Sequence, residues 1–133
     1  MDDIAAIVRA NLMVGWGSMG AGVISGAIIG LFFHRDDWMG GYGSFRRRMT
    51  RLGHISFFGM GFLNVLFALS LMHLPASAAY ARGASIAFVA AAVTMPACCF
   101  MTAWRKPWRH LFPVPVTATA AAIGLLLTGW MTS

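Results

Sequence analysis

The chain has 133 residues, of which 59% are hydrophobic and only 11% are charged, and its mean hydropathy is +0.71. Roughly a quarter of the residues in a soluble domain are charged, so this composition excludes an ordinary soluble domain and predicts a membrane protein. The net charge of +6 does not predict nucleic-acid binding, because the basic residues adjoin apolar segments and form no free arm. We expect their partners to be anionic lipid headgroups.

Four apolar segments predict an all-α membrane protein with four transmembrane helices in one antiparallel bundle, a single domain over residues 1–133. The predicted spans cover approximately residues 5–33, 53–72, 83–104 and 114–130. A helix of about 20 apolar residues is long enough to cross the hydrocarbon core. The polar connections between the segments are too short to hold a second folded domain.

Basic residues are divided unequally between the two ends of this predicted bundle. One end carries Arg35, Arg46, Arg47, Arg48, Arg51, Arg105, Lys106 and Arg109, and the other carries Arg9 and Arg82. Cytoplasmic loops hold the excess of Lys and Arg, so both chain termini are expected outside the cytoplasm in a bacterial-type inner membrane. Trp38, Trp104 and Trp108 fit an aromatic belt at the inner edge.

Small residues recur every fourth position in the first segment, at Ser18, Gly22, Gly26 and Gly30. This spacing places them on one helix face, where another backbone can approach closely. Two interpretations are open. The face docks a partner subunit or a second copy of the chain, or it contacts another helix of the same chain.

Three of the four histidines, His34, His54 and His110, are expected near the cytoplasmic membrane boundary. Histidines at similar depth on separate helices can ligate haem iron or another transition metal. His54 is the main candidate, as a ligand of haem b or of a metal, because Gly61 lies two turns deeper on the same face and leaves room for a flat macrocycle. The alternative is that these amphipathic rings simply sit among headgroups.

The basic cluster at the start of the second segment is the candidate surface for lipid or partner binding. Its members are Arg46, Arg47, Arg48 and Arg51, joined by Arg105 and Arg109 from the third connection. Guanidinium groups at a membrane surface bind anionic headgroups or an acidic partner. The alternative is that they only fix the orientation of the helices.

The polar residues inside the spans are few. All four acidic residues, Asp2, Asp3, Asp36 and Asp37, lie at or beyond span ends, which disfavours a proton-coupled exporter because no carboxylate is embedded. Asn11 and Asn64 lie within apolar segments, and we expect each to hydrogen-bond inside the bundle.

The function expected from these observations is non-enzymatic. We expect a small accessory or structural subunit of a larger membrane complex of respiratory or photosynthetic type. Two alternatives stay open: a redox protein that binds haem b or a quinone at His54, and a small dimeric transporter or channel. No motif in the chain identifies a known family or a catalytic centre.

Overall fold

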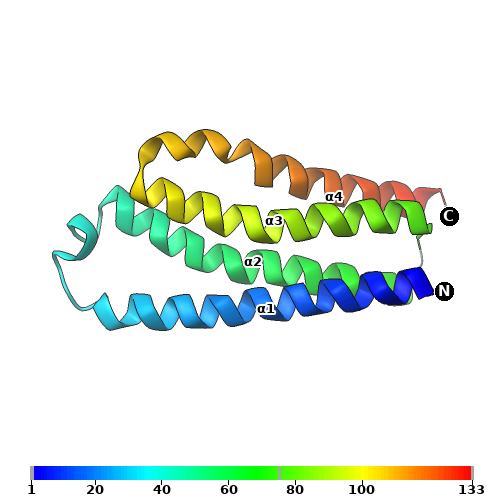
Figure 1. Ribbon diagram of the computed structural model, residues 1–133, viewed down its shortest axis with the longest axis horizontal. Coiled ribbons are helices and arrows are strands. Elements are labelled where there is room, and N and C mark those ends of the chain that lie inside the picture. Colours follow the sequence, from blue (N-terminus) through cyan, green and yellow to red (C-terminus); the bar gives the residue numbers. More distant parts are fainter. Residues whose placement is uncertain (1, 75, 133) are drawn as a thin grey trace.

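The computed structural model describes residues 2–74 and 76–132, and these ranges contain helices and connections without a strand. The long helices are α1 (Asp2–Phe32), α2 (Phe45–His73), α3 (Ala78–Trp104) and α4 (Pro113–Met131). Two 3-10 helices, η1 (Trp38–Gly40) and η2 (Lys106–Leu111), lie in the connections. Four helices are long and apolar enough to cross a membrane, which confirms the predicted multi-pass, all-helical membrane protein (Figure 1).

The second helix begins earlier than predicted, at Phe45 and not at residue 53. Ser44 caps it, because its hydroxyl accepts a hydrogen bond from the backbone N–H of Arg47 at 3.2 Å and satisfies an otherwise free donor. Arginine, methionine and leucine favour helix once it has started. The basic cluster therefore forms the first two turns of α2 and is not part of a loop.

The helices pack in the order of the chain. α2 lies between α1 and α3, and α4 packs on α3, while α1 and α3 share a smaller contact. The amino and carboxyl ends of the chain lie at one end of the molecule, and η1 and η2 lie at the other (Figure 1). In the described part of the chain α4 has no extensive contact with α1 or α2, so α1 and α4 are the outer helices.

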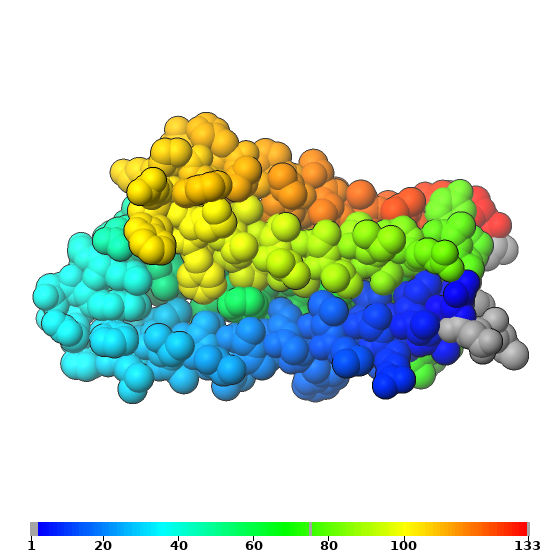
Figure 2. Space-filling model, in the orientation of Figure 1, coloured from blue at the N-terminus to red at the C-terminus, as the bar shows by residue number. Residues whose placement is uncertain are grey.

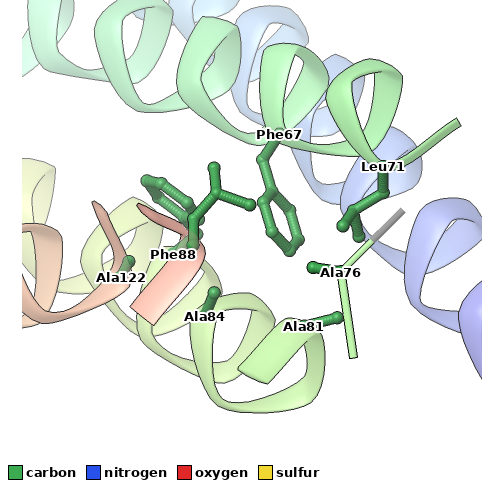
Figure 3. Close-up of a cluster of buried hydrophobic side chains, with 8 residues drawn as sticks. Phe67, Leu71, Ala76, Ala81, Ala84, Phe88 and Ala122 are labelled. Atoms are coloured by element: carbon green, nitrogen blue, oxygen red, sulfur yellow. The ribbon is translucent and has the colours of Figure 1, made fainter. Parts of the chain in front are cut away.

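A cluster of buried hydrophobic side chains lies between α2, α3 and α4 and includes Ala76 of the α2–α3 connection (Figure 3). Phe67 of α2 and Phe88 of α3 meet with their ring centroids 5.1 Å apart. Ala81 and Ala84 on α3 and Ala122 on α4 are completely buried around them. These small side chains let the helices approach closely, which is how helices gain contact when lipid supplies no hydrophobic drive.

Two buried asparagines tie α1 and α2 to α3, as the sequence predicts. The side-chain amide of Asn11 donates to the Ser85 hydroxyl, and that of Asn64 donates to the carbonyl oxygen of Phe88 at 3.3 Å. Both asparagines are fully buried. Because Ser85 and Phe88 are neighbours on one face of α3, the two amides lie about one helical turn apart along it.

Candidate functional site

The small-residue strip of α1 contacts α2 of the same chain. The Ser18 hydroxyl donates to the carbonyl oxygen of Phe57 at 2.7 Å. A Cβ added at Gly22 would lie 2.6 Å from the ring of Phe58, and one at Gly26 would lie 2.6 Å from the ring of His54. Gly30 has open space. Three of the four strip positions are therefore covered by α2 and are not available to dock a partner.

Gly15 of α1 and Gly61 of α2 lie directly against each other's backbone. A Cβ at Gly15 would lie 2.8 Å from the Gly61 carbonyl oxygen, and a Cβ at Gly61 would lie 2.8 Å from the Gly15 carbonyl oxygen. The space that the sequence assigns to a macrocycle beside Gly61 is thus filled by the backbone of α1 and by Met19. Gly61 serves helix packing, and its missing side chain leaves no room for a cofactor.

His54 lies half-buried between α1 and α2. Its Nδ1 is 3.1 Å from the Ser25 hydroxyl oxygen, and its ring meets that of Phe58 edge to face with centroids 5.5 Å apart. His34 and His110 are exposed, in the connection after α1 and in η2 respectively. Within the described residues, no group of three His, Cys, Asp or Glu side chains is arranged to hold a metal ion.

Arg47 differs from the rest of the basic cluster because it is only 1% exposed. Its guanidinium donates to the carbonyl oxygens of Phe33 at 2.7 Å and of Arg35 at 3.3 Å. The same group lies 5.0 Å from the ring centroid of Phe33 and 4.9 Å from that of Tyr42. Arg47 therefore fixes the connection between α1 and α2, and burial removes it from the predicted lipid-binding set.

The other basic residues of this end remain accessible. Exposed side chains are those of Arg46, Arg48, Arg105 and Arg109. Arg51 is half-buried, and its guanidinium lies 4.8 Å from the ring centroid of Tyr42. The ammonium group of Lys106 lies 5.5 Å from the ring centroid of Phe45. The structure thus leaves a basic surface at the end opposite the termini, with Arg47 as its buried support.

A groove runs between α1 and α3, and we name it the α1–α3 groove. Figure 2 shows these helices side by side with atoms of α2 visible between them. At the basic end the groove contains a cavity of about 340 Å³. Its walls are almost entirely apolar, with Arg46 as the charged residue; the lining residues are Ser25, Ile28, Ile29, Trp38, Met39, Arg46, Thr50, Phe100, Ala103 and Trp104.

A second cavity, also of about 340 Å³, continues the groove toward the middle of the helices. Phe100 lines both cavities, so they are neighbours. The second is lined without any charged group, by Val14, Ser18, Phe57, Ala92, Val93, Pro96, Ala97 and Phe100. The groove therefore changes from basic and aromatic at the molecular end to apolar in the interior.

The sequence predicts that three of the lining residues lie at the membrane edge, but it does not predict the groove itself. Trp38, Trp104 and Arg46 stand out in the sequence as membrane-edge residues, whereas Ser25, Thr50 and Phe100 give no sign that they share a cavity. Whether these residues line one cavity depends on the distance between the axes of α1 and α3. Helical periodicity in the sequence does not determine that distance.

Searches with the whole sequence and with the structure find no matching protein family, no matching curated protein and no matching solved structure.

Proposed function

We propose that this chain is a small accessory subunit of a larger complex in a bacterial-type inner membrane. In this proposal the helices form an antiparallel transmembrane bundle with both termini outside the cytoplasm. The basic end faces the cytoplasm, where exposed Arg46, Arg48, Arg105 and Arg109 contact anionic headgroups or a neighbouring subunit.

The proposal is supported by the outer helices α1 and α4, which leave apolar faces uncovered. α1 packs on α2 and to a small extent on α3, and α4 packs on α3. Large apolar side chains point away from these contacts, such as Trp16, Ile24 and Leu31 on α1 and Leu127 on α4. Faces of this kind can associate with further transmembrane helices through side-chain packing, without a change in the chain itself.

The test is gentle extraction of the protein from its own membrane, followed by native mass spectrometry. We expect the chain, of 14.3 kDa, to appear in a larger particle whose mass includes other polypeptides and is not explained by copies of this chain alone. A stable particle that contains only this chain, alone or as a homo-oligomer, would contradict the subunit proposal.

An absorption spectrum of the same sample tests the redox alternative at His54. A haem b protein would show a Soret band that His54→Ala abolishes, and a colourless sample that binds no added haem would eliminate this branch.

The transporter alternative is tested by reconstituting the chain alone, since a transporter should move solute without partners.

A further inference from the structure

We propose that the α1–α3 groove binds one anionic phospholipid of the cytoplasmic leaflet, with its headgroup at Arg46 and an acyl chain along the interior cavity. This assignment rests on the proposed orientation, in which the basic end faces the cytoplasm. Binding of one lipid at one defined site is more specific than the general attraction of anionic lipids to a basic surface.

The charge at the mouth of the groove favours an anionic headgroup. Arg46 lines the cavity and is exposed, and in residues 2–74 and 76–132 no ion pair occupies its guanidinium. A free guanidinium presents a fork of donors that matches a phosphate group. Arg46 is therefore available to a lipid phosphate in a way that buried Arg47 is not.

Hydroxyl-bearing and aromatic residues line the same cavity. Thr50 and Ser25 line the cavity, and Trp104, which is 82% exposed, forms its rim. Trp104 also borders a neighbouring cavity that is lined by Arg105, so a second arginine lies close to this rim. Indole rings are favoured at headgroup depth because one edge is polar and the face is apolar.

The length of the groove matches one leaflet. The stretch of α1 from Val14 to Ile29, which lines the two cavities, rises about 22 Å at roughly 1.5 Å per residue. One leaflet contributes about 15 Å of hydrocarbon, and the remainder accommodates the headgroup region. The charged cavity lies at the membrane edge and the uncharged one lies deeper, which is the order of headgroup and acyl chain in a lipid.

Native mass spectrometry of protein from bilayers that contain phosphatidylcholine and phosphatidylglycerol tests this site. We expect one phosphatidylglycerol per chain to stay bound preferentially. Arg46→Gln should lower its occupancy about five- to tenfold, because the interaction of one cation with an anionic lipid surface contributes about a factor of this size. Arg9→Gln is the control, since Arg9 is an exposed arginine near the opposite end of α1 and lines neither cavity of the groove.

A second pair of variants tests the acyl-chain position. Ala97 is exposed and lines the interior cavity, so Ala97→Trp should fill the groove and release the lipid whatever its headgroup. Ala90→Trp, at an exposed α3 position outside the cavity lining, should retain it. Unchanged circular dichroism and gel-filtration behaviour in all four variants would establish that each one folds.

Three results would overturn the lipid assignment. These are equal retention of the two lipids by the wild type, equal losses in Arg46→Gln and Arg9→Gln, and crosslinking of Ala97→Cys to another polypeptide inside the groove. The two proposals fail separately. A large native assembly without retained phosphatidylglycerol removes the lipid site only, and a lone chain that retains it removes the subunit proposal only.

Discussion

The guanidinium of Arg47 on α2 donates a hydrogen bond to the carbonyl oxygen of Phe33, the residue that follows α1, at 2.7 Å. Carbonyl groups at the end of a helix lack partners within the helix and carry partial negative charge. A buried cation beside them compensates both deficits. This one contact joins the end of α1 to the start of α2 and explains why the arginine lies inside the protein.

Replacing Arg47 should therefore destabilise the protein, although its neighbours in the cluster are dispensable for folding. Arg47→Ala removes two charge-assisted hydrogen bonds and the ring contacts, and we expect a loss of about 2–4 kcal/mol in unfolding free energy. Arg47→Lys keeps the charge but not the fork of donors, so its loss should be intermediate. Arg48→Ala should change stability by less than about 0.5 kcal/mol. Unfolding in mixed micelles measures all three, and equal effects at Arg47 and Arg48 would contradict the structural role.

The pair formed by Gly26 and His54 gives a second prediction. A Cβ at Gly26 would lie 2.6 Å from the His54 ring, whereas one at Gly30 meets nothing within 4 Å. Gly26→Ala should cost about 1–3 kcal/mol through overpacking, and Gly30→Ala should be neutral or stabilise by up to about 1 kcal/mol.

A double-mutant cycle separates this steric account from a general helix effect. In a His54→Ala background the ring is absent, so Gly26→Ala should lose most of its cost, with a coupling of at least about 1 kcal/mol. Additive effects of the two substitutions would show that the ring does not fill the space beside Gly26.

The buried amide of Asn64 gives a third prediction. Its nitrogen donates to the carbonyl oxygens of Met60 and Phe88, but its side-chain oxygen has no partner in the described part of the chain. Interhelical hydrogen bonds in membranes contribute about 0.6 kcal/mol on average, and the unpaired oxygen offsets part of this. Asn64→Leu should thus change stability by less than about 1 kcal/mol, while Asn64→Asp should cost about 2–3 kcal/mol. A large loss for the leucine variant would indicate that a further group satisfies the oxygen.

Sequence patterns predict the helices of this protein better than they predict its site. The apolar segments are long enough to identify all four long helices, because a membrane span is set by length and composition. The boundary of α2 is missed because arginines can belong to a helix that continues past the membrane surface. The buried state of Arg47 is missed because its acceptors, the carbonyls of Phe33 and Arg35, belong to a connection whose path is not periodic.

The glycine strip shows a different limit. Its spacing correctly marks a face for close helix contact, since spacing determines which residues share a face. It does not reveal which helix comes to that face, because α2 and a helix of a partner would satisfy the same pattern. His54 and Gly61 are recognised as unusual residues for the same reason, yet their neighbours are Gly26 and Gly15 of α1.

Membrane orientation can be measured with single introduced cysteines, since the side chains of both native cysteines on α3 are buried. Cys98 is 4% exposed and Cys99 is fully buried, so background labelling by an impermeant maleimide should be low. Ser77 caps α3 without a side-chain hydrogen bond, and Arg48 is exposed at the basic end, so cysteine at either position should be tolerated. We expect Ser77→Cys to react on intact cells and Arg48→Cys to react only after permeabilisation, as the positive-inside rule requires. The reverse pattern would place Arg46 at the outer leaflet. The α1–α3 groove would then open to that leaflet and could not bind a lipid of the cytoplasmic leaflet as proposed.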